Sequence, residues 1–242
     1  MSVGNTGLPR HHVPAAFDVG AGAYDRLVGA SPGYHDQLRL SARRMHLPDK
    51  GRGLRLLDAG CGTGASTAAL LGVAPHAAEI IAVDASRGML VEAAAKTWPP
   101  SVRFVHASVE ALAENGVAGP FDGIMAAYLI RNLPDPDAAL RAFLPMLRPG
   151  ATLAVHEYSV RDSRPATWIW HAVCWGIIIP AGWRHTRDTT LYRHLWRSVA
   201  TFDGARRFRQ RLSDAGYAAV RSESMPGWEA NIVHTFLGDA PR

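Results

Sequence analysis

Residues 56–64 read LLDAGCGTG, an apolar run followed by glycines at every second position. The apolar residues predict a buried strand, and the residues after Gly64 have the apolar spacing of a helix. Glycine adopts positive φ and lets a ligand approach the backbone closely, while the first turn of a helix presents N–H groups without intrahelical partners. The stretch therefore predicts a strand, a loop and a helix that together bind a polar ligand.

A carboxylate follows at a distance typical of nucleoside-binding folds. Asp84 ends the second apolar run, twenty residues after Gly64, where a doubly wound fold places an acidic group that accepts hydrogen bonds from ribose hydroxyls. The spacing Gly60-x-Gly62-x-x-Ala65 also fits the dinucleotide fingerprint. The glycines alone therefore leave open whether the ligand is NAD or another nucleoside, and a tight turn without any ligand is the structural alternative.

Strands and helices alternate from residue 54 to about 157, and the pattern returns near residue 204. The expected strands are 54–57, 80–83, 102–105, 121–126, 152–155, 218–222 and 231–237, and the expected helices between them include 65–71, 89–96, 137–147 and 204–215. Strands that alternate with helices of this length indicate βαβ units. We therefore expect an α/β fold, a Rossmann-like doubly wound sheet of seven mostly parallel strands.

Two regions flank or interrupt this pattern. Residues 1–50 predict an N-terminal arm and helices, including a helical region at 24–46, and residues 51–242 form the α/β domain, so that the chain is effectively one domain. Residues 160–203 contain five of the seven tryptophans and no strand pattern. We interpret them as a helical lid inserted after the fifth strand, where insertions cover the carboxyl edge of a sheet.

Composition and charge restrict the possible partners. The 242 residues are 48% hydrophobic and 19% charged, as expected for a folded globular chain. The formal charge is +5, but residues 184–221 alone carry nine Arg and three Asp, or +6, which leaves −1 for the rest. The basicity is therefore local, and we expect no nucleic-acid partner. Two distant cysteines, Cys61 and Cys174, form no disulfide framework, and no hydrophobic leader is visible, which favours a cytoplasmic setting.

The tryptophan-rich and Arg-rich parts of the insertion adjoin each other. Residues 165–183 are free of charge, but prolines interrupt them and they fall short of a membrane-spanning length of about 20 residues. Tryptophan favours the membrane interface and arginine favours anionic head groups. We therefore expect peripheral membrane contact through residues 165–200; a helix packed on the sheet with a solvated outer surface is the alternative.

The motifs resemble those of a known family. DAGCGTG at 58–64 resembles motif I of the class I S-adenosylmethionine (SAM) methyltransferases, and DASRGML at 84–90 resembles their next segment. LIRNLPD at 129–135, LRPG at 147–150 and HEYS at 156–159 are similar to the ubiquinone/menaquinone-biosynthesis C-methyltransferase family. The likeness covers about residues 17–238, includes a Tyr-Asp pair at 24–25, and is strongest from 54 to 159.

The resemblance implies a SAM-dependent methyltransferase that methylates a carbon atom of a lipophilic aromatic, prenylated or quinone-type small molecule. The cofactor-binding residues that it implies are Tyr24, Asp58, Gly60, Cys61, Gly62, Gly64, Asp84, Ala85, Met89, Ser108, Val109 and Ala126. Ser108 departs from the family, which has an aspartate there against the adenine amine. A hydroxyl can still accept that hydrogen bond.

Arg131 and Asn132 occupy the catalytic place that the resemblance implies. Because arginine stays protonated, we expect Arg131 to stabilise a phenolate and a water or a histidine, with His156 at the active edge, to accept the proton. No histidine pair has the spacing of a metal site, and this type of methyl transfer requires no metal. An O- or N-methyltransferase of secondary metabolism and a SAM-binding protein without catalysis are the alternatives.

Overall fold

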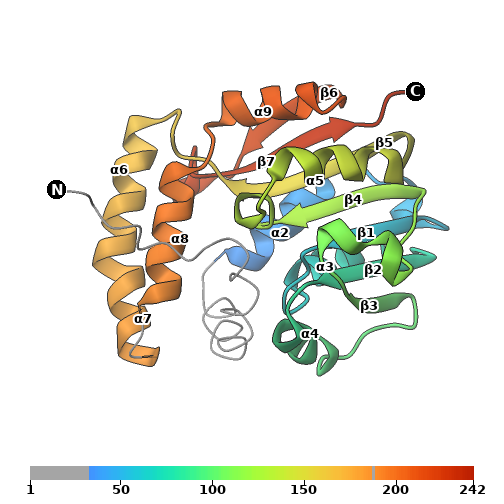
Figure 1. The fold of residues 1–242 in the computed structure, drawn as a ribbon, viewed down its shortest axis with the longest axis horizontal. Coiled ribbons are helices and arrows are strands. Elements are labelled where there is room, and N and C mark those ends of the chain that lie inside the picture. Colours follow the sequence, from blue (N-terminus) through green and yellow to red (C-terminus); the bar gives the residue numbers. More distant parts are fainter. Residues whose placement is uncertain (1–32, 187–188) are drawn as a thin grey trace.

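The fold is a seven-stranded sheet flanked by helices, seen in a computed structural model that describes residues 33–186 and 189–242 (Figure 1). The strands are β1 (Arg55–Ala59), β2 (Glu79–Asp84), β3 (Val102–His106), β4 (Phe121–Ala127), β5 (Leu147–Tyr158), β6 (Ala218–Ser224) and β7 (Val233–Asp239). Their order in the sheet is β3-β2-β1-β4-β5-β7-β6, and β7 runs in the direction opposite to the other six strands. The expected Rossmann-like, mostly parallel sheet is confirmed.

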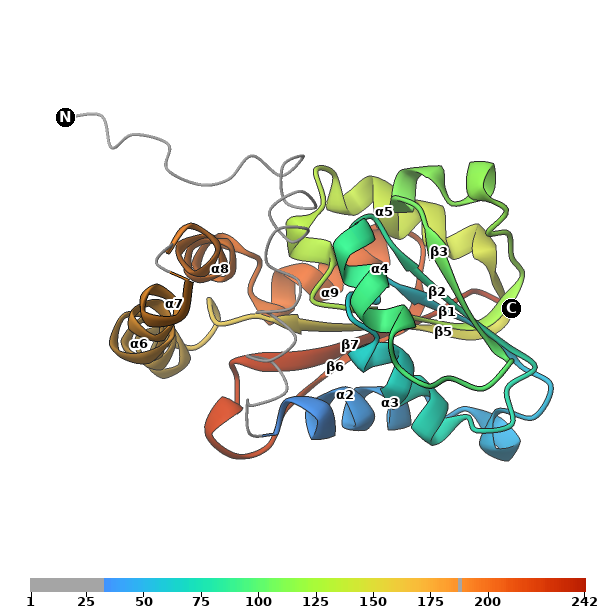
Figure 2. The same cartoon turned by 90° about the horizontal axis from the view of Figure 1, so that it is seen from below.

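Helices cover both faces of the sheet (Figure 2). On one face lie α2 (Tyr34–Arg43) and α3 (Ala65–Val73), whose buried side chains pack with Leu56 and Ile80. On the other lie α5 (Pro136–Phe143) and α9 (Ala205–Asp214), which contribute Phe143 and Phe208 to the larger core. A further helix, α4 (Arg87–Ala94), packs beside β2 and β3.

Local sequence signals explain where several helices begin. Gly64 precedes α3 with φ +91°, a left-handed conformation that L residues rarely adopt. The Ser86 hydroxyl accepts a hydrogen bond from the backbone of Met89 and caps α4, and the Asp135 carboxylate caps α5 in the same way. Short 3₁₀ turns lie at Pro48–Gly51, Val109–Ala111, Ala113–Asn115, Ile130–Asn132, Leu144–Met146 and Gly227–Glu229.

The helix expected at 137–147 is shorter than predicted. The structure ends α5 at Phe143, forms a 3₁₀ turn at Leu144–Met146 and begins β5 at Leu147, which pairs with Phe121. Pro145 supplies the physical reason, because a proline lacks the backbone N–H that would continue the helix. β5 is therefore much longer than the expected strand at 152–155.

The insertion after β5 is helical, as expected. It contains α6 (Arg164–Val173), a π-helical turn (Cys174–Ile178), α7 (Ile179–Thr186) and α8 (Thr190–Thr201). Both views show these helices grouped beyond the carboxyl ends of the parallel strands (Figures 1 and 2). Within the described ranges, no helix combines the length and the apolar character needed to cross a membrane.

Candidate active site

A cavity of about 720 Å³ lies at the carboxyl edge of the parallel strands. That volume falls within the range of roughly 300–1,000 Å³ typical of small-molecule sites. Ten of the sequence-predicted site residues line it: Gly60, Cys61, Gly62, Asp84, Ala85, Met89, Ser108, Val109, Arg131 and Asn132. The sheet therefore brings residues from four separate chain segments to one hollow.

The glycine loop after β1 forms one wall of the cavity. A Cβ atom at Gly62 (φ +55°) would meet nothing within 4 Å, so the backbone there faces open space. A Cβ atom at Gly60 (φ +73°) would instead lie 2.9 Å from Leu129. Gly62 thus leaves room for a ligand, whereas Gly60 lets the loop pack against the segment after β4.

Asp84 holds the loop and still offers acceptor capacity to a ligand. One carboxylate oxygen accepts a hydrogen bond from the backbone of Gly62 and the other from the backbone of Ser86, each at 2.8 Å. A carboxylate has about four acceptor positions, so both oxygens can also accept bonds from ribose hydroxyls. The carboxylate, the open backbone at Gly62 and the apolar side chains of Met89 and Val109 fit a nucleoside cofactor.

The acidic character of the cavity fits a cationic cofactor. Among the described residues, three carboxylates, Asp84, Glu110 and Asp135, line it, against one arginine, Arg131. SAM carries a sulfonium and an ammonium group, and carboxylates favour cations nearby. Both the shape and the charge of the residues present therefore suit the cofactor that the sequence implies.

Asp58 is placed differently from the expectation, because it does not line the cavity. It is fully buried and accepts hydrogen bonds from the hydroxyls of Ser66 (2.8 Å) and Thr67 (2.6 Å) at the start of α3. Burial raises its pKa to about 7, opposed by these two bonds and assisted by the nearby charge of Asp84. Asp58 therefore orders the glycine loop from behind.

Two other predicted residues, Gly64 and Ala126, lie outside the cavity wall. Gly64 packs against Trp98, and Ala126 is fully buried while its neighbour Ala127 lines the cavity. Tyr24 lies outside the described residues. Side chains alternate across a strand, so the one-residue difference between Ala126 and Ala127 selects the opposite face of β4.

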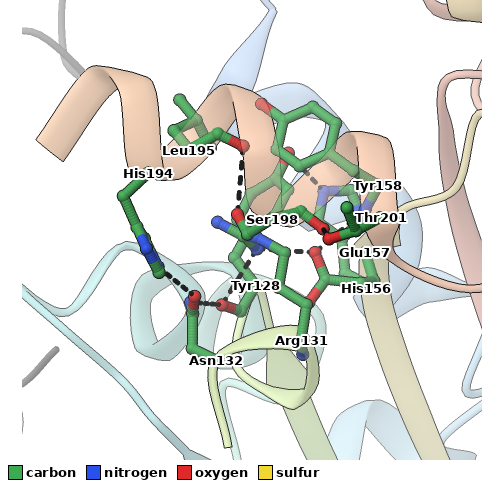
Figure 3. A network of polar contacts seen from close by, with 10 residues as sticks. All are labelled: Tyr128, Arg131, Asn132, His156, Glu157, Tyr158, His194, Leu195, Ser198 and Thr201. Carbon is green, nitrogen blue, oxygen red and sulfur yellow. Dashed lines mark hydrogen bonds and ion pairs between the residues drawn. The ribbon is translucent and has the colours of Figure 1, made fainter. Parts of the chain in front are cut away.

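Arg131 lines the cavity from the segment after β4 and is paired with a carboxylate that the sequence did not predict. Its Nη1 atom donates to Glu157 Oε1 at 2.6 Å and to the Tyr128 carbonyl at 3.1 Å (Figure 3). Burial raises the pKa of Glu157 although Arg131 acts in the opposite direction. Asn132 donates to the same Tyr128 carbonyl at 2.9 Å, and its side-chain oxygen lies 3.4 Å from His194 Nε2 of α8. The insertion is thereby joined to the cavity wall.

His156 is the clearest correction. It is fully buried and does not line the cavity, and its Nε2 atom lies 2.9 Å from the hydroxyl of Tyr128, which does (Figure 3). Burial, Arg44 and Arg131 lower the pKa of His156 to about 3. It can therefore reach a substrate only through Tyr128, and not as the proton acceptor that we expected.

Two cavity-lining tyrosines, Tyr34 and Tyr128, were also missed. Their rings are stacked with centroids 5.8 Å apart, and Tyr128 also contacts Tyr158 at 4.8 Å. Tyr128 directly precedes the Leu129–Asn132 motif, and that adjacency was the only signal in the sequence. Together the rings form an aromatic wall beside the Arg131 guanidinium.

Comparison with known proteins identifies the family. The model of the ubiE/COQ5 methyltransferase family matches residues 6–236. The ubiquinone/menaquinone biosynthesis C-methyltransferase UbiE of Idiomarina loihiensis is 28% identical over 180 residues, covering 73% of this chain and 71% of its own length. The demethylmenaquinone methyltransferase of Clavibacter sepedonicus is 35% identical over 149 residues, 61% of this chain and 58% of that protein.

Solved structures share the fold at low sequence identity. A SAM-dependent methyltransferase from Thermotoga maritima superposes with a TM-score of 0.65 at 17% identity, covering 95% of this chain and all of that one. The magnesium protoporphyrin IX methyltransferase of Synechocystis gives 0.66 at 14% identity, covering 95% and 98%. These likenesses support the Rossmann-like methyltransferase fold.

Proposed function

The chain belongs to the ubiE/COQ5 methyltransferase family, and from this membership we propose that it transfers the methyl group of SAM to a ring carbon of a lipophilic hydroquinone or related phenol. The chain is a methyltransferase that uses SAM; the acceptor and the methylated atom are the proposed part. The observation that carries the proposal is Arg131, which lines the same cavity as Asp84. Asp84 ends β2 and Arg131 follows β4, on the opposite side of β1. One side of the cavity thus suits a nucleoside and the other a developing oxyanion.

SAM supplies a methyl group on a positively charged sulfur, which leaves as a neutral thioether. The protein contributes mainly by holding the two reactants in line, an effect worth roughly 7–11 kcal/mol. Asp84 and the glycine loop hold the cofactor end. Arg131, held by Glu157 at 2.6 Å, stabilises the substrate oxygen once it has lost its proton. The phenolate would make its ring carbon nucleophilic. This carbon would take the methyl group as the carbon–sulfur bond breaks, and the proton on that carbon would then pass to water, so that the ring becomes aromatic again.

The test is transfer of label from methyl-labelled SAM to defined acceptors under reducing conditions. We expect demethylmenaquinol to be methylated on carbon, shown by a product mass gain of one methyl group with both hydroxyls retained. A methyl ether as product would favour the O-methyltransferase of secondary metabolism. Transfer only to water-soluble phenols would refute the lipophilic acceptor, and unchanged turnover in Arg131→Ala would refute the role of Arg131.

We also propose that the outer face of α6 and α7 contacts a membrane surface, from which such an acceptor could enter. Trp168, Trp175 and Trp183 are 76%, 48% and 53% exposed. At 100° per residue, the seven residues from Trp168 to Trp175 fall about 20° short of two turns. In a regular α-helix, the eight residues from Trp175 to Trp183 would exceed two turns by about 80°. The π-turn contains one residue more than an α-turn, so Trp183 returns to nearly the same side of the helix as Trp175. The three indoles therefore share one face.

The charge around this face favours an anionic bilayer. No acidic residue lies between Ser163 and Arg184, and exposed arginines stand at both ends, at 164 and 184. Arg193 of α8 lies 5.7 Å from the ring of Trp175. Tryptophan at the interface and arginine near anionic head groups are the usual elements of peripheral contact.

Sedimentation with phosphatidylglycerol vesicles tests this face. We expect binding that weakens in pure phosphatidylcholine and falls at least tenfold when the three indoles are replaced by alanine. Trp228→Ala is the matched control, because Trp228 is 59% exposed but lies outside the insertion. Equal vesicle binding by the wild type and the triple variant would refute the proposal. A dimer formed by the wild type and by Trp228→Ala but not by the triple variant would also refute it, because the indoles would then lie in a protein interface.

A further inference from the structure

A chain of hydrogen bonds connects the outer edge of the sheet to the cavity. Arg44 Nη1 donates to Thr235 Oγ1 (2.8 Å), Thr235 Oγ1 lies 2.6 Å from Ser41 Oγ, and Ser41 Oγ lies 2.7 Å from His156 Nδ1. His156 Nε2 then meets the Tyr128 hydroxyl at 2.9 Å. Ser41, His156 and Thr235 are buried completely. We refer to Arg44, Thr235, Ser41 and His156 as the relay chain.

The relay chain has a single consistent direction. A guanidinium can only donate, so Thr235 Oγ1 accepts from Arg44. Thr235 has one hydroxyl hydrogen, and among the described residues Ser41 Oγ is the only acceptor within bonding distance. Ser41 must therefore accept from Thr235 and donate its own hydrogen to His156 Nδ1. The hydrogen of the imidazole then resides on Nε2, which donates to the oxygen of Tyr128.

The electrostatics keep the imidazole in this form. Burial, followed by the charges of Arg44 and Arg131, lowers the pKa of His156 to about 3, so the ring is neutral at ordinary assay pH. A protonated imidazole would also carry a hydrogen on Nδ1, and this hydrogen would face the hydroxyl hydrogen that Ser41 donates. The positive end of the relay chain at Arg44 is itself held by Glu223, 2.9 Å from its Nε atom.

The hydroxyl hydrogen of Tyr128 is left for the cavity. The Tyr128 oxygen accepts from His156, and no other described residue lies within bonding distance of that oxygen. Tyr128 lines the cavity and has φ +54°, a left-handed conformation unusual for a residue with a side chain. Buried polar groups and backbone strain both oppose folding, and strain of this kind clusters at functional sites. Here the buried relay chain and the strained backbone both meet at Tyr128, which lines the cavity.

We propose that Tyr128 donates a hydrogen bond to an oxygen of the aromatic acceptor, and that the relay chain sets the direction of that bond. Tyr128 is thus the residue that touches the substrate, while His156 and Ser41 are positioning residues. The inference rests on the proposed function in one respect, namely that the acceptor carries a ring oxygen. A phenolate accepts such a bond better than a phenol does, so Tyr128 and Arg131, whose guanidinium lies 5.6 Å from the Tyr128 ring, together favour the anion.

The experiment measures which ionisation state of a bound naphthol the site prefers. The probe is 4-nitro-1-naphthol, titrated by absorbance across pH with the full chain and S-adenosylhomocysteine, so that no methyl transfer is needed. We expect the wild type to bind the anion more tightly than the neutral form. Tyr128→Phe should lose about tenfold of that preference, as expected for one hydrogen bond to a charged group, and Ser41→Ala should lose a smaller part.

A matched control separates this effect from a general loss of structure. Tyr217→Phe removes a phenolic hydroxyl that donates to the Leu140 carbonyl, outside the cavity lining, and should leave the preference unchanged. Nitrogen NMR of ¹⁵N-histidine protein, assigned with His156→Gln, should show hydrogen on Nε2 of His156. An Nδ1–H tautomer, or an anion preference retained in Tyr128→Phe, overturns the inference.

The outcome is independent of the proposed reaction. If the anion preference depends on Tyr128 but no acceptor is methylated on carbon, the proposed reaction fails and this inference stands. If methylation on carbon is found and Tyr128→Phe retains the preference, the inference fails and the reaction stands.

Discussion

Replacing Glu157 by glutamine should destabilise the protein strongly, because the substitution leaves the Arg131 charge buried. The side chains of Glu157 and Arg131 are 0% and 7% exposed, and their closest atoms are 2.6 Å apart. Removal of one partner from a buried ion pair costs about 3–5 kcal/mol. Glu157 Oε1 also accepts from the backbone of Tyr158 at 2.9 Å, and Oε2 accepts from the backbone of Arg131 at 3.4 Å, so the amide of glutamine turns an N–H toward a donor in either orientation. We expect the free energy of unfolding to fall by about 3 kcal/mol, the lower end of this range, since one acceptor oxygen remains.

Urea unfolding followed by tryptophan fluorescence measures the loss. For a chain of this length, about 3 kcal/mol lowers the melting temperature by roughly 6–12 °C. Glu79→Gln is the control, because Glu79 pairs with Arg55 at 3.0 Å where both side chains are about one-third exposed, and such pairs contribute about 0–1 kcal/mol. Adding Arg131→Met to Glu157→Gln should restore part of the stability. A loss no larger than that of Glu79→Gln, or no recovery in the double variant, would refute the reasoning.

Three further predictions concern the cofactor end. Burial raises the pKa of Asp58 from 3.8 to about 7, so its stabilising contribution is full below pH about 4 and is lost as pH rises through 7, a change of up to about 4 kcal/mol. The free energy of unfolding, measured at pH 5 and pH 8, should therefore fall more for the wild type than for Asp58→Asn. A difference between the two proteins that stays the same at both pH values would contradict this. Gly64→Ala places a Cβ atom 2.7 Å from Trp98, whereas the new Cβ atom in Gly62→Ala meets no neighbour. Thermal unfolding should therefore show the larger loss of stability for Gly64→Ala, and calorimetry with SAM should show the larger loss of affinity for Gly62→Ala. The reverse order would count against our description of the loop. Asp84→Asn should weaken SAM binding about 10- to 100-fold in the same calorimetry, as expected when hydrogen bonds to a charged acceptor are lost, and an unchanged affinity would remove Asp84 from the site.

The sequence was sufficient for the parts of the protein that depend on local pattern. The apolar run into Gly60, Gly62 and Gly64 and the carboxylate at Asp84 predicted the parallel sheet and the cofactor wall, because backbone freedom and strand period are properties of adjacent residues. The helical insertion followed from the loss of strand pattern after Glu157. These features require no knowledge of what packs against them.

The missed features depend on residues far apart in the chain. His156 is held by Ser41, 115 positions earlier, and Arg131 by Glu157, 26 positions later, and no periodicity reveals such pairs. The predicted helix end near 147 was wrong for a local reason, because Pro145 lacks the backbone N–H that would continue the helix. Ala126 was misplaced by one residue, which the period of two in a strand converts into the opposite face.

The π-turn at Cys174–Ile178 has a consequence for changes in chain length. A turn with one residue more than an α-turn can lose that residue and remain helical, so a single deletion there should be tolerated by the backbone. The deletion would nevertheless rotate Trp183 by about 100° around the axis relative to Trp168. Insertions and deletions at this turn thus rotate α7 about its axis, which changes the direction that its side chains face without changing its sequence.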